Sequence, residues 1–454
     1  MAQLEVLKIR DVVDSRPLGI MQWVTMALCF SVAVLDGTDT LMMGFVAPPM
    51  SASLHIPMKE FGPVFSAALV GLLLGALICG PLADKIGRRW LLIGCTTFFG
   101  LLTVITPSAQ TFDQLLVIRF LTGLGLGGAM PSAVAIASEY SPSRMARTFV
   151  ASVFCGMPTG GMIAGILSYM LIPHTGWQSV FYVGGILPLV IAVALIALVP
   201  ESVCFLVGKG ASAERIRKIV GRISPELGDT NRYRFISDEP VRSGVPVKYL
   251  FTEGRASQTI LLWIPYAMNL LILYFVGSWM PALLHSAALP VSAGIVAVSL
   301  WNAAGVFSSP VQGVLMNRFS PGKVLFAEFF GYITLTLLLS TINLSFVSIM
   351  STIFVMGICV QGAQAALNAL AAEIYPTNIR STGVGWALGV GRVGSIAGPL
   401  LGGAMVALNW DLSTIFVAAA LPGGIAMVCV VANMLMRRGK LLHQRAHDTQ
   451  TAPH

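Results

Sequence analysis

Twelve apolar runs, each long enough to cross a bilayer, constrain what this chain can fold into more than any other feature. The hydrocarbon core of a membrane is ~30 Å thick, and a helix needs ~20 mostly apolar residues to cross it. The runs occupy 19–49, 62–83, 91–107, 112–138, 146–171, 177–199, 259–284, 293–316, 323–342, 346–372, 379–407 and 412–436. The sequence therefore predicts an all-α polytopic membrane protein with twelve transmembrane helices, because helices satisfy their own backbone hydrogen bonds in lipid.

The composition agrees with a surface that mostly faces lipid. Hydrophobic residues make up 56% of the chain and charged residues 11%, whereas soluble domains carry roughly 25% charged residues. The net charge of +8 is divided among short clusters, so it forms no basic stripe, and we expect no nucleic-acid partner. The seven cysteines lie in or beside apolar runs without C-x-x-C spacing, and we expect no metal site and no cofactor. The sequence has no H-E-x-x-H, G-x-S-x-G or phosphate-loop motif, so an enzyme is not expected.

The basic residues between the runs predict the orientation of the chain. Cytoplasmic loops carry an excess of Lys and Arg. With the N-terminus inside, only Lys59 falls in an outer loop, while Arg119 and Arg392 fall within spans. We therefore expect a multi-pass protein of the bacterial inner membrane with both termini cytoplasmic. No signal-peptide cleavage site is evident in residues 1–18, so the first span is expected to direct insertion.

Three pairs of segments recur at an offset of 233 or 234 residues. Residues 80–85 align with 313–318, residues 139–142 with 373–376, and residues 161–165 with 394–398. The repeat predicts two parallel six-helix bundles around a midplane cavity. The expected organisation is a cytoplasmic segment, an N-terminal bundle, a cytoplasmic linker with room for a short surface helix, a C-terminal bundle and a cytoplasmic tail, over 1–18, 19–199, 200–258, 259–436 and 437–454.

The loop after the second span, Gly80-Pro-Leu-Ala-Asp84-Lys-Ile-Gly87-Arg88-Arg89, closely resembles the G-x-L-a-D-[RK]-x-G-R-R loop of the major facilitator superfamily. With the twelve spans and the repeat, this resemblance covers essentially the whole chain. It implies the major facilitator fold and transport by alternating access. In the second copy Asn317 replaces the aspartate and Ser320-Pro321 replaces Gly-Arg, so the two loops are not expected to gate equally.

Glutamates at the ends of the fourth and tenth spans, with arginines after them, resemble the inner-gate pairs of that superfamily. Anchoring at the membrane interface is the alternative interpretation of these charges. The resemblance implies a gating set of Gly80, Asp84, Gly87, Arg88, Arg89, Glu139, Arg144, Arg147, Glu373 and Arg380.

A narrower resemblance comes from the first span, where Asp36-Gly37-Thr38-Asp39 is similar to the D-G-x-D signature of the aromatic acid:proton symporters. That family imports benzoate, hydroxybenzoate, protocatechuate and phenylpropionate types of acid. The resemblance implies a proton-coupled importer of a small aromatic carboxylate. Its expected partners are the carboxylate, protons and membrane lipids, with a monomer as the functional unit. The alternative is a facilitator of another solute: an aliphatic acid, a sugar or an exported drug.

Asp36, Asp39, Arg119 and Arg392 are ionisable residues that lie well within the predicted spans. Each costs at least ~2.5 kcal/mol at mid-span, so such residues usually face a cavity and have a function. Asp36 and Asp39 share a helical face, and two carboxylates held close suit proton binding. We predict proton coupling by Asp36, Asp39 and Arg119, the alternatives being a helix cap at Asp36 and a structural tie from Arg119 to Asp36.

Arg392 is predicted to bind the substrate carboxylate, because a guanidinium stays charged and forms bidentate hydrogen bonds. Asp39 is included in the substrate set. An aromatic ring also needs apolar walls and a group that recognises a hydroxyl. The candidates at plausible depth are Tyr266, Asn269, Trp279, Trp301, Gln364 and Trp386. Packing or a position at the membrane interface is the alternative for the aromatic residues.

Overall fold

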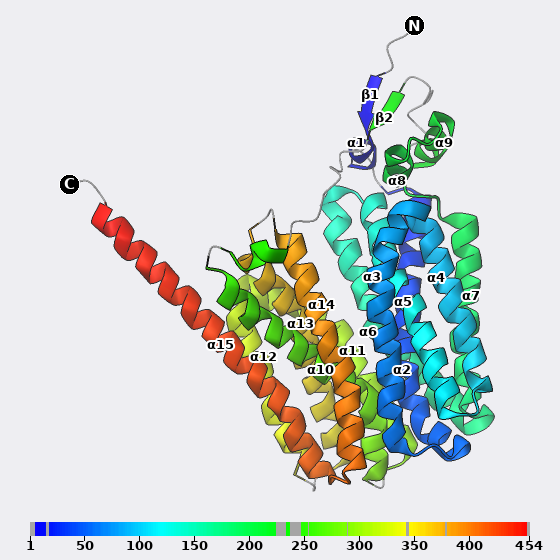
Figure 1. Cartoon of the computed structure of the whole chain (residues 1–454), viewed down its shortest axis with the longest axis vertical. Coiled ribbons are helices and arrows are strands. Elements are labelled where there is room, and N and C mark those ends of the chain that lie inside the picture. Colours follow the sequence, from blue (N-terminus) through cyan, green and yellow to red (C-terminus); the bar gives the residue numbers. More distant parts are fainter. Residues whose placement is uncertain are drawn as a thin grey trace. The chain divides into compact units, whose positions relative to one another are not determined.

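The computed structural model describes residues 5–14, 18–223, 233–236, 247–252, 254–287, 289–341, 345–376 and 379–451 (Figure 1). Two compact units, Met1–Ser243 and Gly244–His454, divide the chain. The division lies within the 200–258 stretch, where the sequence placed its linker.

Twelve helices in the described part of the chain are long and apolar enough to cross a membrane, which confirms the twelve predicted spans. Unit 1 contains α2 (Ile20–Leu54), α3 (Phe61–Ile86), α4 (Arg88–Ile105), α5 (Phe112–Tyr140), α6 (Ser143–Thr175) and α7 (Gln178–Leu198). Unit 2 contains α10 (Ala256–Ser286), α11 (Val291–Arg318), α12 (Pro321–Leu339), α13 (Phe346–Ile374), α14 (Arg380–Ala407) and α15 (Leu412–Thr451).

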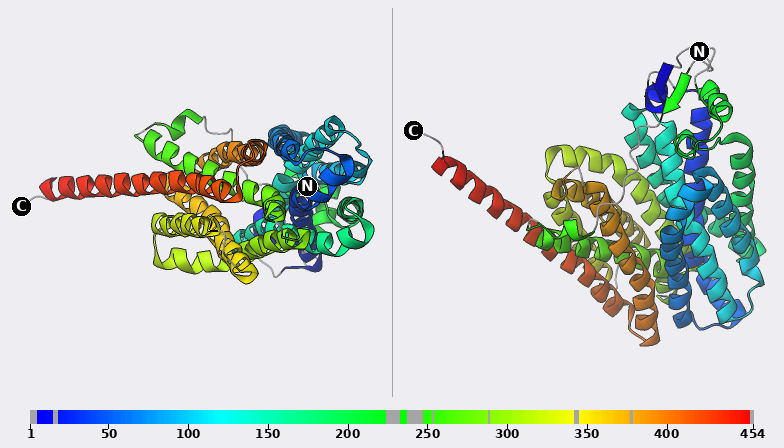
Figure 2. Two further views of the ribbon diagram at one scale, coloured as in Figure 1. Left: turned by 90° about the horizontal axis from the view of Figure 1, so that it is seen from below. Right: turned by 45° about the horizontal axis from the view of Figure 1, so that its top comes forward.

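The largest boundary differences are at α2 and α15. The first span was expected to end at 49, but α2 continues through Pro48 and Pro49 to Leu54. The added turn is held in place because Trp177 Nε1 donates to Ser53 Oγ over 2.8 Å. The last part of α15 extends beyond the other helices of unit 2 (Figure 2).

The two units use the same packing scheme. In unit 1, α2 packs on α6, α3 on α5, and α4 on both α5 and α7; in unit 2, α10 packs on α14, α11 on α13, and α12 on both α13 and α15. These are equivalent pairs under the 233–234-residue repeat. Glycine allows the closest approaches: a Cβ at Gly394 would overlap the backbone of Ala267, as one at Gly37 would overlap that of Met157.

A small extramembrane layer adds strands to the expected all-helical fold. Strand β1 (Glu5–Lys8) pairs in parallel with β2 (Tyr233–Ile236). Beside them lie α1 (Ile9–Asp14), α8 (Val203–Gly208) and α9 (Ala213–Ile223) (Figure 1). One buried cluster joins α1, α8 and α9 through Ile9, Val12, Val203, Leu206, Ile216, Ile219 and Val220. Short 3-10 turns complete the described structure at Met58–Glu60, Thr106–Ser108 and Val247–Leu250.

Candidate functional site

A buried ion pair lies inside unit 1. The Arg119 guanidinium on α5 donates to both carboxylate oxygens of Asp39 on α2, over 3.3 and 2.9 Å, and also to the Asp39 backbone carbonyl. Thr103 Oγ1 on α4 donates to Asp39 Oδ1 over 2.5 Å. Asp39 and Arg119 are 0% and 1% exposed. Three helices therefore share one charged cluster that is shielded from solvent, and the partner of Arg119 is Asp39.

Asp36 is also buried, one helical turn before Asp39 on α2. Between them, Thr38 Oγ1 donates to the Gly160 carbonyl of α6 over 3.1 Å. A Cβ at Gly160 would in turn overlap the α2 backbone around Val34 and Thr38. The acidic segment of α2 is thus fixed by direct backbone packing against α6.

Unit 2 buries a neutral polar cluster between α10 and α13. Asn269 Nδ2 donates to Gln364 Oε1 over 3.1 Å, and Tyr266 Oη donates to Asn368 Oδ1 over 2.6 Å. The remaining amide atoms, Asn269 Oδ1 and Gln364 Nε2, are buried without a hydrogen-bond partner among the described residues. The two bonded amides therefore leave one acceptor and one donor unsatisfied, and a hydroxyl group can both donate and accept a hydrogen bond.

Arg392 lies half-buried on α14, and its guanidinium Nη1 donates a hydrogen bond to the phenolic oxygen of Tyr274 on α10 over 3.2 Å. Unlike Arg119, it has no ion pair with a carboxylate in the described structure. The guanidinium contacts a neutral hydroxyl, so its positive charge remains available to bind an anion.

The three predicted tryptophans have different surroundings. Trp279 is fully buried, its Nε1 donates to the Pro399 carbonyl over 2.9 Å, and its ring covers Gly402. Trp301 is buried where α11 meets Gly357 of α13. Trp386 is 46% exposed and stacks on Trp263. The structure thus gives Trp279 and Trp301 packing contacts within unit 2, and their substrate role stays a prediction.

The loop of residues 80–89, which resembles that of the superfamily, is held by the carboxylate of Glu201, a residue that was not among the predicted site residues. Gly87 ends α3 with φ of +101°, and a Cβ there would contact the Glu201 carboxylate. Glu201 Oε1 accepts from the backbone N–H of Arg89 over 3.1 Å, at the start of α4. A carboxylate is stabilised at a helix N-terminus. Glu201 follows the sixth predicted span, far from Gly87 in the sequence, and only folding brings the two together.

Each predicted gating glutamate pairs within its own unit. Glu139 forms an ion pair with Arg88, so the ends of α5 and α4 are joined. Glu373 pairs with Arg437 of α15 over 2.6 Å, and Arg380 Nε instead donates to the Tyr375 carbonyl over 3.3 Å. The gating role itself stays a prediction.

Three other members of the gating set are exposed at the surface of unit 1. Gly80 and Asp84 are exposed on the last turns of α3, and no atom lies within 4 Å of a Cβ built at Gly80. Arg144 is exposed on the first turn of α6. The side chain of Arg147 lies outside the described residues.

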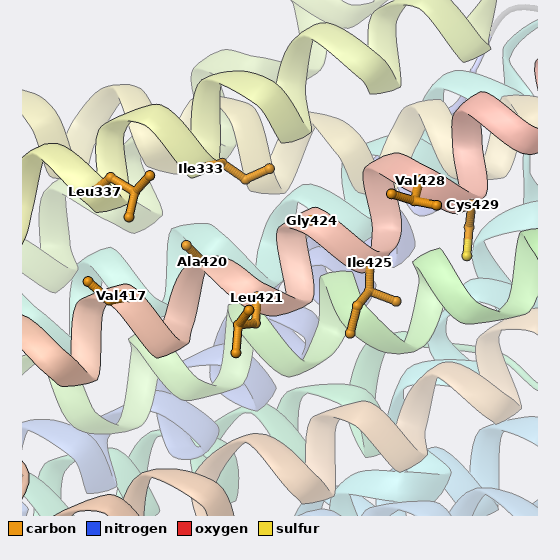
Figure 3. Close-up of a pocket in the computed structure, with 9 residues that line it drawn as sticks. All are labelled: Ile333, Leu337, Val417, Ala420, Leu421, Gly424, Ile425, Val428 and Cys429. Atoms are coloured by element: carbon orange, nitrogen blue, oxygen red, sulfur yellow. The ribbon is translucent and has the colours of Figure 1, made fainter.

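One groove on unit 2 is unsuited to an anion. It is formed by Ile333 and Leu337 of α12 facing Val417, Ala420, Leu421, Gly424, Ile425, Val428 and Cys429 of α15 (Figure 3). These nine residues carry no charge and no strong hydrogen-bond donor, and several are exposed on the outer face of the helices. Carboxylate recognition needs charged or N–H donors, so the polar clusters are the better candidates.

The described residues form twelve spanning helices in two equivalently packed units. The first unit buries an ion pair, and the second buries polar groups that lack hydrogen-bond partners. These features are those of a polytopic membrane carrier. The sequence pattern of the Major Facilitator Superfamily matches residues 28–353. The chain belongs to this superfamily, and it is a multi-pass inner-membrane transporter, not an enzyme.

Curated relatives cover almost the whole chain. It is 37% identical to the 4-hydroxybenzoate transporter PcaK of Pseudomonas aeruginosa, over 95% of this chain and 97% of that protein. It is 36% identical to the gallate transporter of Pseudomonas putida, over 94% and 95%. It is 34% identical to the 3-(3-hydroxy-phenyl)propionate transporter of Escherichia coli, over 91% and 94%.

A solved structure agrees on the fold. The crystal structure of a bacterial homologue of the human lysosomal transporter Spinster matches with a TM-score of 0.66 at 18% identity, over 92% of this chain and 96% of that one. This match confirms the predicted major facilitator fold, and the curated relatives confirm the resemblance to aromatic acid transporters.

Proposed function

We propose that this protein imports a small aromatic carboxylate of the benzoate, hydroxybenzoate, protocatechuate or phenylpropionate type together with a proton. The substrate class is supported by the names of the relatives, which are transporters of 4-hydroxybenzoate, gallate and 3-(3-hydroxy-phenyl)propionate. Proton coupling is supported by a single observation, the Asp39–Arg119 ion pair closed by Thr103.

The ion pair suggests how a proton affects the carrier. Removing one partner of a buried pair leaves an uncompensated charge, which typically costs 3–5 kcal/mol. Protonation of Asp39 removes its charge and frees the Arg119 guanidinium, so it favours a conformation in which Arg119 has another anionic partner or water. Asp36, one turn away, is the second carboxylate of the proposed proton path.

The substrate groups of this proposal are in unit 2. Arg392 supplies the cation for the carboxylate. Asn269 Oδ1 accepts from a ring hydroxyl, and Gln364 Nε2 donates to it. Tyr266, held by Asn368, adds an aromatic wall. Trp279, Trp301 and Trp386 are proposed as further aromatic contacts of the substrate.

The orientation also belongs to the proposal. Ser143 Oγ, at the start of α6, accepts a hydrogen bond from Arg10 and donates one to Asp14, and the backbone N–H of Arg89 donates to Glu201. The basic loops of unit 1 and its N-terminal segment therefore lie at the same end of the unit. With the excess of Lys and Arg at this end, both termini are proposed to be cytoplasmic. The functional unit is proposed to be a monomer in contact with membrane lipids.

Uptake into proteoliposomes tests the function. With an imposed pH gradient, acid outside, labelled benzoate, 4-hydroxybenzoate or protocatechuate should accumulate, whereas labelled glucose should not. Without the gradient the acids should only equilibrate. Accumulation of glucose, or acid uptake equal to that of protein-free liposomes, would reject the proposal.

Asp36→Asn tests the proton path separately. It should abolish gradient-driven accumulation but leave counterflow exchange of the labelled acid, because exchange requires no net proton movement. Asp113→Asn is the matched control, since Asp113 is an exposed carboxylate at the start of α5. Accumulation by Asp36→Asn equal to that of the unmodified protein would remove Asp36 from the coupling role.

A further inference from the structure

A fifth ionisable side chain lies inside a span, and the transport proposal does not use it. Glu328 is on α12, seven residues after its first residue, and is 7% exposed. Its carboxyl oxygen Oε1 accepts a hydrogen bond from Nε2 of Gln312 on α11, which is 1% exposed. Gly362 of α13 faces both side chains, since a Cβ there would overlap them. Three helices therefore enclose an acid and an amide.

No cation pairs with Glu328 in the described part of the chain. Lys323 on its own helix lies five residues earlier, about 7 Å along the axis. Arg318 ends α11, and Arg437 of α15 is engaged by Glu373 of α13. Arg438 is the next residue of α15 after Arg437. The thiol of Cys359 on α13 is a titratable group close to Glu328. An ionised carboxylate here would be buried in the span without a counter-charge, which strongly favours the neutral acid.

The hydrogen bonds lead to the same conclusion. Apart from the hydrogen bond between Gln312 Nε2 and Glu328 Oε1, the other two atoms of these groups, Glu328 Oε2 and Gln312 Oε1, are both buried without a partner among the described residues. If Glu328 is ionised, both atoms are acceptors and neither can satisfy the other. If Oε2 carries a proton, it can donate to Gln312 Oε1. The acid and the amide then form a cyclic pair in which each group donates once and accepts once.

The internal repeat gives an independent argument. At the offset of 233 residues, Gln312 and Glu328 correspond to Cys79 and Cys95 of unit 1, and Gly128 corresponds to Gly362 at 234. The two sulfur atoms lie 3.9 Å apart, and a Cβ at Gly128 would approach both to 2.5 Å. Unit 1 therefore fills this position with two thiols, which are uncharged when protonated.

We propose that Glu328 is a second proton-binding site, in the C-terminal bundle, where its protonated carboxyl forms a cyclic pair with the Gln312 amide and joins α11 to α12. A proton taken from water binds Oε2. Its loss leaves two acceptor oxygens facing each other in a buried site, so deprotonation weakens the contact of α11 with α12. This site is separate from the Asp39–Arg119 pair of unit 1.

Infrared spectroscopy of the purified protein in lipid nanodiscs tests the proposal without measuring transport. A protonated carboxyl has a C=O stretch resolved above the amide bands, and an ionised one does not. At neutral pH the difference spectrum between the unmodified protein and Glu328→Gln should contain this band, which separates Glu328 from any other protonated carboxyl. The difference spectrum for Glu373→Gln should lack it, because Glu373 is ion-paired. Absence of the band from the Glu328→Gln difference spectrum would overturn the assignment.

A second variant keeps the test decisive if Glu328→Gln does not fold. Gln312→Leu removes the proposed acceptor of the acid proton, so the band should move to higher frequency while remaining present. An unchanged band in Gln312→Leu would show that the pair does not exist. Since neither measurement involves substrate, failure of the transport proposal would leave this result intact, and the converse also holds.

Discussion

The polar interiors of the two units differ in the kind of group they bury. Unit 1 encloses a complete ion pair, Asp39 with Arg119, whose carboxylate is further satisfied by Thr103. Unit 2 encloses amides between α10 and α13 and leaves an acceptor and a donor unpaired at Asn269 and Gln364. A closed ion pair responds to a proton, whereas open hydrogen-bonding groups can recognise a neutral part of a ligand. We therefore propose that one packing scheme serves two different tasks.

The largest expected effect is at the ion pair. Asp39→Asn should abolish proton-driven accumulation and lower the unfolding free energy by about 3–5 kcal/mol, because Arg119 is left buried with its charge uncompensated. Thermal unfolding in detergent and uptake in proteoliposomes measure the two effects. The double variant Asp39→Asn/Arg119→Gln should recover stability but not accumulation. Accumulation by Asp39→Asn at the unmodified level would end the assignment of proton coupling to this pair.

The two glycines at equivalent repeat positions test whether the units respond alike to a small added volume. Gly128→Ala and Gly362→Ala each force a methyl group against a buried side-chain pair, and each should lower the unfolding free energy by about 1–3 kcal/mol. Only Gly362→Ala should also change the carboxyl band in the infrared spectrum, since Gly128 covers thiols. Chemical denaturation at equal detergent concentration gives the comparison. Equal stability of both variants and the unmodified protein would contradict the close packing.

The amide cluster should determine recognition of a ring hydroxyl. Gln364→Leu should lower uptake of 4-hydroxybenzoate relative to benzoate by about tenfold, because one lost hydrogen bond to a buried group costs ~1–3 kcal/mol. Competition between the two labelled acids measures this ratio. Gln361→Leu is the matched control: Gln361 lies on the same helix but donates to the Trp301 carbonyl, so it should alter both acids equally. An unchanged ratio in Gln364→Leu would place hydroxyl recognition elsewhere.

The smallest expected effect concerns the N-terminal segment on unit 1. Burial alone would raise the pKa of Asp14, but hydrogen bonds from the Ser143 side chain and backbone and the charges of Arg10 and Arg144 outweigh it and lower the pKa. Its stabilising contribution is therefore present above the ordinary carboxyl pKa and is lost as pH falls through the lowered value. Asp14 is partly exposed, so the effect should stay below about 1 kcal/mol.

Hydrogen exchange of residues 9–14 measures the attachment of that segment. In the unmodified protein the protection factor, which is the slowing relative to the intrinsic exchange rate at the same pH, should fall on acidification, and Asp14→Asn should show low protection at every pH. Asp11→Asn, an exposed neighbour on α1, should behave like the unmodified protein. Identical exchange in Asp14→Asn and Asp11→Asn would show that the contact with Ser143 does not hold the segment.

The predicted spans are confirmed, but one acid inside them, Glu328, was not among the predicted site residues. Glu328 lies five residues inside the predicted span 323–342, and the cost argument that identified Asp36 applies to it equally. It was omitted although the signal was present. Thr103, Tyr274 and Asn368 gave no such signal, because a hydroxyl or an amide in a span is common and becomes informative only through the partner it meets.

The twelve helices, the two-part repeat and the superfamily can be predicted from the amino-acid sequence, because bilayer thickness imposes a length and a composition that each span displays on its own. The side-chain partners become visible in the folded protein: Arg119 pairs with Asp39, Glu201 holds the Gly87 loop, Glu139 and Glu373 pair with Arg88 and Arg437, and Glu328 contacts Gln312. These contacts join helices far apart in the chain, and their geometry depends on how each helix is rotated about its axis, which hydrophobic length does not specify.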